Sequence, residues 1–373
     1  MAAIAAAARA APRLARRAAP RTFASDAYLG SDLETSTLPN GVVVTTTAPG
    51  APLTCVGVGV GRGASHGPRS AALAASLNSF KTANGRTDLR IQRDLEIAGS
   101  MPYSSFDAHQ TTTVCTQHVV TREAPCVAEA FQAAALAAGV GRDALTAWEF
   151  EETKASPFAL NALARHASLE EQVASAAYGK AYAPLGAADD LAALSSADVD
   201  AWLQEAMSSA PITAIGLGME HAVMVSLAQN VLGDLAERQP SAEKYPAFQA
   251  GGVVAISGDA GCAIGVPAPA DEAMALTVAS AVGGSLSQGL VVVTGEDKEA
   301  CTAQLNAIGD VALAKVAAAS DLLDLAPEAL AALIARGQDP AALYDAILAL
   351  DDAAISAAHA SATSNAPAAV IAA

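Results

Sequence analysis

Aromatic residues make up only 4% and charged residues only 16% of this 373-residue chain, which has five cysteines. Hydrophobic residues make up 52% of the chain, which excludes the composition of a disordered protein. Five cysteines at this length, with no Cys-x-x-Cys spacing, exclude a disulfide scaffold and are expected to be buried thiols. The length accommodates two or three domains with ample apolar material for their cores.

Basic residues are scarce outside the N-terminus. Of the 21 basic residues, five arginines lie in residues 1–23, whereas none of the 38 acidic residues does, so the remainder has a net charge of −22. Phosphate backbones repel a body this acidic, and no stripe combines basic with aromatic residues. The composition therefore argues against a nucleic-acid-binding protein.

Residues 1–23 have the composition of a mitochondrial targeting peptide, because arginines interrupt an alanine-rich, acid-free segment. The sequence Arg21-Thr22-Phe23-Ala24-Ser25 predicts cleavage near Phe23, and a disordered N-terminus without a targeting role is the alternative. No later apolar run reaches the roughly 18 residues that a transmembrane helix requires. We therefore expect a mature protein that is soluble or is held at a membrane by a partner.

The pattern of apolar residues and of glycine and proline predicts an α+β protein. Two strand pairs are expected, one between 42–44 and 54–61 and one between 252–258 and 262–267. Further strands are expected at 100–107, 111–119, 212–218, 290–294 and 368–373, and helices at 69–78, 88–98, 124–139, 144–178 with a break near Pro157, 197–208, 221–236, 270–282 and onward to about 360.

Self-comparison predicts a duplication. A shift of 156 residues places Val199 on Ile355, Ala210-Pro211 on Ala366-Pro367 and Ile215 on Ile371. We expect a first domain at 36–236, a polar, proline-containing linker at 237–246, and a shortened second domain at 247–373. The shorter copy is expected to have a smaller sheet that lacks central strands.

Four segments carry a resemblance to the inverted-zinc-motif peptidase family, which includes pitrilysin, insulinase and the mitochondrial processing peptidase. Residues 37–42 (TLPNGV) resemble the usual opening of these chains, 56–63 the strand before the zinc helix, and 80–99 the segment after it. Residues 212–221 resemble the core-protein-2 branch of the family in the mitochondrial cytochrome bc complex. The resemblance implies two homologous α+β domains, each with a mainly antiparallel sheet and helices packed on one face.

The same resemblance locates the zinc site of the family's peptidases, His-x-x-Glu-His on a helix with a distal glutamate. Aligned on the following motif, its three positions fall on Leu73, Ser76 and Leu77, and the distal glutamate falls near Glu151 or Glu152. We therefore expect a pseudo-enzyme with no catalytic, metal or cofactor-binding residues. The six histidines also form no pair three or four residues apart: His66, His109, His118, His166, His221 and His359.

A non-catalytic member of this family with a mitochondrial leader implies a structural core subunit of ubiquinol–cytochrome c oxidoreductase, complex III. The resemblance implies a position on the matrix side of the inner membrane, without a transmembrane helix of its own. It also implies a dimeric complex whose other subunits are a core-protein-1-like partner, cytochrome b, cytochrome c1 and the Rieske protein. The alternatives are the non-catalytic, substrate-recognising subunit of a processing peptidase and a diverged soluble matrix protein.

Three weaker signals have simpler interpretations. Gly59-x-Gly61-x-x-Ala64 partly fits a dinucleotide-binding fingerprint, but no acidic residue follows at the required distance, which favours a glycine-lined strand. The segment 283–289 resembles in position the glycine-rich substrate loop of a processing peptidase, but it is short and favours a plain turn. Five acids that could attract basic presequences are best explained as solvated surface: Glu149, Glu151, Glu152, Asp189 and Asp190.

Overall fold

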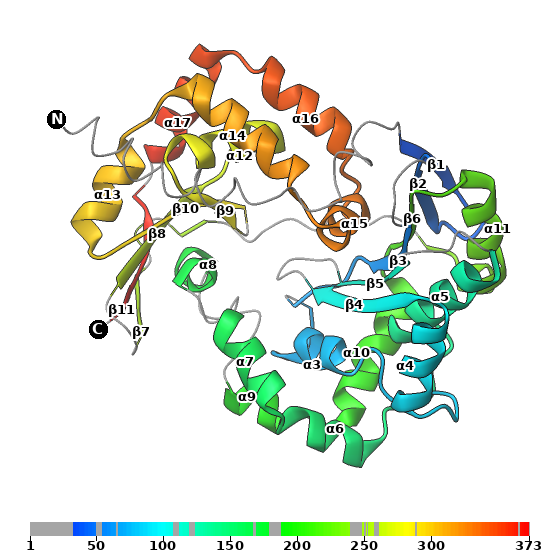
Figure 1. Cartoon of the computed structure of the whole chain (residues 1–373). Coiled ribbons are helices and arrows are strands. Elements are labelled where there is room, and N and C mark those ends of the chain that lie inside the picture. The colour runs from blue at the N-terminus through cyan, green and yellow to red at the C-terminus, as the bar shows by residue number, and fades with distance from the viewer. Residues whose placement is uncertain are drawn as a thin grey trace.

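The computed structural model places most of the chain beyond residue 32 (Figure 1). The predicted leader, 1–23, and residues 239–246 of the predicted linker lie outside the described residues. The description covers residues 33–49, 54–64, 66–106, 112–118, 124–166, 169–178, 188–238, 248–249, 251, 253–256, 261–287, 289–364 and 366–372.

These residues form a mixed architecture of helices and two sheets. The strands are β1 (Leu33–Thr37), β2 (Val43–Thr47), β3 (Thr54–Val60), β4 (Ser100–Phe106), β5 (Thr112–His118), β6 (Ile212–Leu217), β7 (Val253–Ile256), β8 (Gly261–Pro267), β9 (Ser285–Ser287), β10 (Leu290–Gly295) and β11 (Ala368–Ala372). The helices are α3 (Ala71–Leu77), α4 (Asp88–Ile97), α5 (Ala124–Ala137), α6 (Ala147–Lys154), α7 (Pro157–His166), α8 (Leu169–Tyr178), α9 (Ala188–Ala193), α10 (Ser196–Ser209), α11 (His221–Leu232), α12 (Glu272–Ala281), α13 (Lys298–Asn306), α14 (Val311–Leu323), α15 (Pro327–Ala335), α16 (Pro340–Ala349) and α17 (Asp352–Thr363).

The first sheet has six strands in the order β1-β2-β6-β3-β5-β4, and only the β2–β6 pair is parallel. The predicted pairing of 42–44 with 54–61 is wrong, because β6 lies between β2 and β3 and pairs with both. The hairpin partner of β2 is β1, which the sequence pattern did not predict. The physical reason is burial: every residue of β3 is buried, so β3 is a central strand with a neighbour on each side.

The second sheet repeats this arrangement with five strands in the order β7-β11-β8-β10-β9. Here β11 lies between β7 and β8, parallel to the first and antiparallel to the second, so the second predicted strand pair is also wrong. The expected loss of central strands is likewise wrong, since β11, β8 and β10 form the interior of this sheet. Within the described residues the second sheet has no counterpart of β1, and β9 is short. The positions matched by the 156-residue shift occupy equivalent elements, with Ile215 in β6, Ile371 in β11, and Val199 and Ile355 fully buried in α10 and α17.

One face of each sheet is covered by helices from its own half of the chain. In β3, Val56, Val58 and Val60 pack with α4, α5, α10 and α11. In β8, Ile264 and Val266 pack with α12, α13 and α17. This is the arrangement that the family resemblance implied for a mixed α/β fold.

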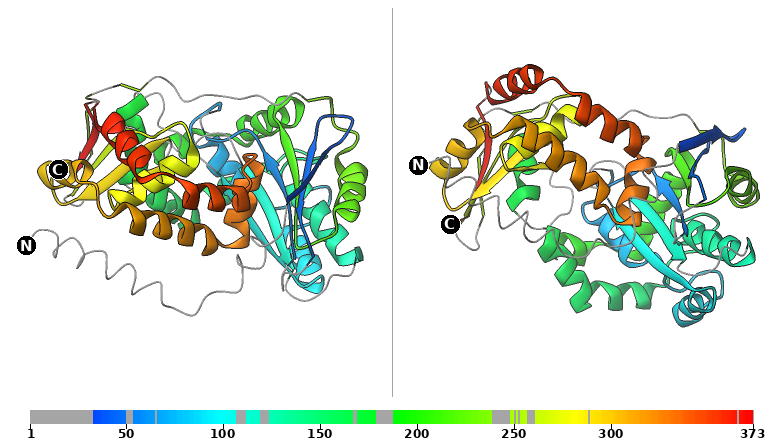
Figure 2. Two further views of the ribbon diagram at one scale, coloured as in Figure 1. Left: turned by 90° about the horizontal axis from the view of Figure 1, so that it is seen from above. Right: turned by 45° about the horizontal axis from the view of Figure 1, so that its top comes forward.

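The opposite face of each sheet is covered by a helix from the other half, which corrects the expectation of helices on one face only. Helix α15 packs on the first sheet against Cys55 and Ile215, and α8 packs on the second sheet against Ala263 and Val292 (Figure 1). Figure 2 shows α14, α15 and α16 extending from the second sheet toward the first. The predicted helix over 144–178 is divided into α6, α7 and α8, and Pro157 opens α7 as expected.

None of the helices within the described ranges has both the length and the hydropathy to cross a membrane.

Candidate functional site

The opening motif at 37–42 forms a junction between the first hairpin and α11. The Asn40 side chain donates from Nδ2 to the carbonyl of Leu232 at 2.7 Å and to those of Gly233 and Leu235 at 3.3 Å. It therefore satisfies carbonyls that the C-terminus of α11 leaves without helical partners. Gly41 has φ +84°, and a Cβ there would lie 2.3 Å from the carbonyl oxygen of Arg238, so the turn requires glycine.

The motif at 212–221 ends on a second structural contact. His221 is the first residue of α11, and its Nδ1 lies 2.8 Å from Thr46 Oγ1. Its Nε2 lies 3.0 Å from Ser36 Oγ. The imidazole thus joins α11 to both strands of the β1–β2 hairpin. The two segments most specific to the peptidase family therefore hold the same three elements together.

Helix α3 is the first helix after β3, and it carries the three positions that the motif alignment assigned to the zinc site. Leu73 is 1% exposed within an apolar cluster, and Leu77 packs against that cluster. Ser76 Oγ lies 3.0 Å from Ser104 Oγ, which in turn lies 3.0 Å from Ser79 Oγ. The three positions lie on one face of the helix, as ligands would, but two aliphatic side chains and a hydroxyl bound to another hydroxyl hold no zinc ion.

The predicted acidic positions do not converge on one point. Glu149 is buried, with Oε1 3.5 Å from the backbone nitrogen of Thr82. Glu151 is 63% exposed and pairs with Lys154 at 3.0 Å, while Glu152 is exposed. The remaining two, Asp189 and Asp190, lie in the first turn of α9. Most of these acids therefore lie on solvated helix surfaces, and only Glu149 is enclosed.

Arg142, on which the charge of Glu149 acts, joins the segment after α5 to the segment after α3. Its Nη1 donates to the carbonyl oxygens of Asn78 at 2.9 Å and Ser79 at 3.3 Å. Burial lowers the pKa of Arg142, whereas Asp200, Asp143 and Glu149 oppose the shift in that order. The guanidinium thus binds carbonyl oxygens just after the C-terminal end of α3.

Across the described residues, no three histidine, cysteine, aspartate or glutamate side chains are grouped closely enough to hold a metal ion. His359 is buried, and its Nε2 lies 2.8 Å from the carbonyl oxygen of Leu305, so its contact is structural. His109 lies outside the described residues.

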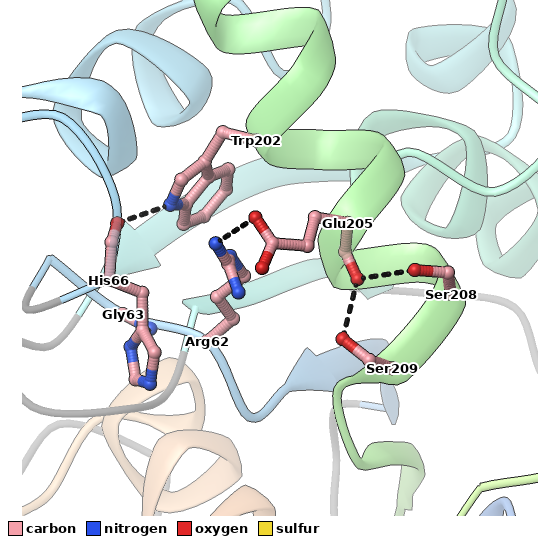
Figure 3. A network of polar contacts seen from close by, with 7 residues as sticks. All are labelled: Arg62, Gly63, His66, Trp202, Glu205, Ser208 and Ser209. Atoms are coloured by element: carbon pink, nitrogen blue, oxygen red, sulfur yellow. Dashed lines mark hydrogen bonds and ion pairs between the residues drawn. The ribbon is translucent and has the colours of Figure 1, made fainter.

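A polar network beside α3 was not predicted from the sequence (Figure 3). Arg62 follows β3 and pairs with Glu205 at 2.6 Å while lying over the Trp202 ring, 5.8 Å from its centroid. Trp202 Nε1 donates to the carbonyl of His66 at 2.7 Å. Gly67 has φ +80°, and a Cβ there would lie 2.9 Å from the Trp202 ring. The network fixes the loop that leads into α3. Its members lie far apart in the sequence, so no local sequence pattern predicts that they meet.

The glycine motifs have packing roles. A Cβ on Gly59 would lie 2.4 Å from Ala335 Cβ in α15, and one on Gly61 would lie 3.0 Å from Pro211. These contacts occupy the space in which a dinucleotide fingerprint would admit pyrophosphate. The segment 283–289 contains strand β9, which pairs with β10, so the expectation of a plain turn is wrong for residues 285–287.

Comparisons with known proteins give a fold. No protein-family model matches the chain, and no curated protein matches it in sequence. Among solved structures, a protease from Helicobacter pylori superposes with a TM-score of 0.68 over 91% of this chain and 99% of that one, at 14% sequence identity.

The chain has a protease-like fold. At this identity the likeness is one of architecture, and it extends over nearly the full length of both chains. It agrees with the peptidase-family fold that the sequence motifs implied.

Proposed function

We propose that this protein is a non-catalytic, structural core subunit of mitochondrial ubiquinol–cytochrome c oxidoreductase, similar to core protein 2. The proposal is supported by the protease-like fold, together with the sequence alignment that assigns Leu73, Ser76 and Leu77 to the zinc-motif positions. Two of these side chains pack in an apolar cluster, and the third bonds to Ser104. A scaffold with packing contacts at these positions suits an architectural role.

Leu73, Ser76 and Leu77 do not meet the requirements of a catalytic zinc site. A catalytic zinc needs three protein ligands and an open position for water, and a general base must reach that water. Leucine supplies neither function, and a serine hydroxyl engaged with Ser104 is a poor base. The proposed subunit therefore contributes surface and shape, and redox cofactors belong to its neighbours.

Outward-facing apolar side chains support a role in assembly. On α14, Leu313 is 50% exposed and Val316 is 60% exposed, and the adjacent α16 exposes Leu348. Trp148 and Phe158 are exposed on α6 and α7. Large apolar side chains grouped at a surface are typical of protein–protein contacts, and obligate interfaces are large and hydrophobic. The proposed partners are a core-protein-1-like subunit, cytochrome b, cytochrome c1 and the Rieske protein, at the matrix side of the inner membrane.

A native gel tests the proposal. Mitochondrial membranes from the source organism are solubilised in a mild detergent, separated, blotted for this chain and stained for heme. We expect this chain to comigrate with the b- and c-type hemes in one large band. A heme-free heterodimer with an active peptidase would contradict the proposal and favour the processing-peptidase alternative. A free monomer, under conditions that keep cytochrome c1 in its complex, would favour a soluble matrix protein.

A further inference from the structure

Two of the five cysteines meet in the interior of the second sheet. Cys262 lies in β8 and Cys301 in α13, and both are buried, at 1% and 0% exposure. Cys301 Sγ donates to the carbonyl oxygen of Cys262 at 3.4 Å, and each of the two thiols shifts the pKa of the other. Both are free thiols in the described structure. The fold thus brings two cysteines that are 39 residues apart in sequence into one buried cluster.

The local structure explains why they meet. Cys262 stands opposite Gly295 in the β8–β10 register. A Cβ on Gly295 would lie 2.9 Å from Cys301 Sγ, so the missing side chain provides the space that this sulfur occupies. Asp297 caps α13 by accepting from the backbone nitrogen of Ala300 at 2.7 Å. The cap fixes the first turn of α13, which carries Cys301, over the end of the strand pair.

We propose that Cys262 and Cys301 are a redox-sensitive dithiol site that forms an intramolecular disulfide when the protein is exposed to a peroxide. In the first step, the Cys262 thiolate attacks one oxygen of hydrogen peroxide and the O–O bond breaks. This gives a sulfenic acid and, after proton transfer, water. In the second step, Cys301 attacks that sulfur, the S–O bond breaks, and a second water leaves. Two thiols are oxidised by two electrons, and one peroxide is reduced to two waters.

The order of the two cysteines follows from their environment. Burial and, to a smaller extent, the neighbouring Cys262 raise the pKa of Cys301 to about 12. Burial also raises the pKa of Cys262, but the hydrogen bond from Cys301 and the charge of Lys298 oppose this shift. Cys262 is therefore the thiol that ionises and attacks first, and Cys301 resolves the intermediate. Because both thiols are buried, the reaction is slow compared with that of an exposed thiolate.

The disulfide would link β8 to α13 and enclose α12, β9 and β10. Closing this segment restricts the unfolded chain, so oxidation stabilises the second sheet and its helices. The other three cysteines lie in other elements, Cys55 in β3 and Cys115 in β5 of the first sheet and Cys126 in α5. The site thereby makes the stability of one half of the scaffold depend on exposure to peroxide.

The test uses the full chain, reduced and then incubated with hydrogen peroxide for increasing times. Non-reducing peptide mapping is expected to yield a linked pair of peptides containing Cys262 and Cys301. The melting temperature is expected to rise by on the order of 5 °C and to return after treatment with dithiothreitol. If Cys262 and Cys301 both remain reduced in the folded protein after Cys126 has been oxidised, the proposal is wrong.

Three variants test the order of reaction. Cys301→Ser should accumulate a sulfenic acid at Cys262 that dimedone traps, whereas Cys262→Ser should leave Cys301 unlabelled. Cys126→Ser is the matched control, and its Cys262–Cys301 link should form at the wild-type rate. Equal labelling of both cysteines, or labelling of Cys301 alone, would overturn the assigned order. Mapping of the wild-type protein decides on the disulfide itself even if a serine variant fails to fold.

Discussion

Replacing Gly59 with alanine places a methyl group where α15 crosses the first sheet. The new Cβ would lie 2.4 Å from Ala335 Cβ and 3.3 Å from Ala335 Cα. Carbon atoms in contact prefer about 3.5–4.0 Å, so α15 would have to move by roughly 1 Å. Neither atom of Ala335 is the end of a flexible side chain, so rotation of a side chain cannot relieve the clash.

The magnitude follows from the cost of overpacking a close-packed core. We expect Gly59→Ala to lower the free energy of unfolding by about 1–3 kcal/mol. Ala335→Gly removes the opposing methyl group and costs up to about 1 kcal/mol through helix propensity. In the double variant the clash is absent, so its loss should be smaller than the sum of the two single losses by about 1–2 kcal/mol.

Urea unfolding of the four proteins, followed by far-ultraviolet circular dichroism and tryptophan fluorescence, measures this coupling. The matched control is Gly85→Ala, since a Cβ on Gly85 meets nothing within 4 Å. Any stability that Gly85→Ala loses comes only from the positive φ of +72° at that turn. Ala335→Gly should therefore not restore the stability of Gly85→Ala. An additive cycle for Gly59 and Ala335, or a Gly59→Ala protein as stable as the wild type, would refute the packing of α15 on β3.

Four further predictions follow from other contacts. Gly265→Ala in β8, where a Cβ would lie 2.5 Å from Val173 Cγ1, should destabilise the protein, and Val173→Ala should relieve that loss in a double-variant cycle measured by urea unfolding. Asn40→Ala should lower the free energy of unfolding by about 1–2 kcal/mol through loss of the bonds to the end of α11, and a loss below 0.3 kcal/mol would contradict this role. Burial raises the pKa of Tyr178 to about 12. The stability that the neutral tyrosine contributes is therefore complete below its unfolded pKa of about 10 and is lost as the pH rises toward 12. Tyr178→Phe should flatten this alkaline decline of the melting temperature, and an unchanged slope would contradict the prediction. The purified chain should contain no stoichiometric zinc by elemental analysis and should melt at the same temperature with and without a chelator, so a chelator-induced drop would count against a metal-free fold.

The order of elements along the chain could largely be predicted from local sequence, but strand pairing could not. Periodic apolar residues and breaks at glycine and proline indicate helices and strands regardless of their partners. The insertion of β6 between β2 and β3, and of β11 between β7 and β8, depends on strands that arrive after long stretches of intervening chain. A hairpin between sequence neighbours is the simplest expectation, and both sheets depart from it in the same way.

The crossing helices show a second limit. Helices α8 and α15 contain many small apolar residues, so their sequences show which side is buried but not which sheet covers it. The decisive signals are on the sheets, where Gly59 and Gly265 leave space for a helix to approach. A glycine in a strand indicates a close approach, but it does not identify the approaching element.

The residue types at positions 73, 76 and 77 can be read from the sequence, but the contacts that these side chains make cannot. Leucine and serine at the zinc-helix positions are informative by residue type alone. The role of Asn40 at the end of α11, and the contact of Arg62 with Trp202, join residues far apart in sequence and became visible only in the fold. Asn40 and His221, which belong to the motifs that resemble a peptidase signature, lie at structural junctions of this fold.

The most direct test of the account is the heme content of the assembly that contains this chain. The tagged protein would be purified from mild-detergent extracts of mitochondrial membranes, with an untagged strain as control, and its dithionite-reduced minus oxidised spectrum recorded against the amount of chain. A structural subunit of the cytochrome bc complex should bring b- and c-type hemes with it in fixed proportion through successive columns. A preparation of the chain that is free of heme and contains a zinc peptidase as its partner would contradict the proposal.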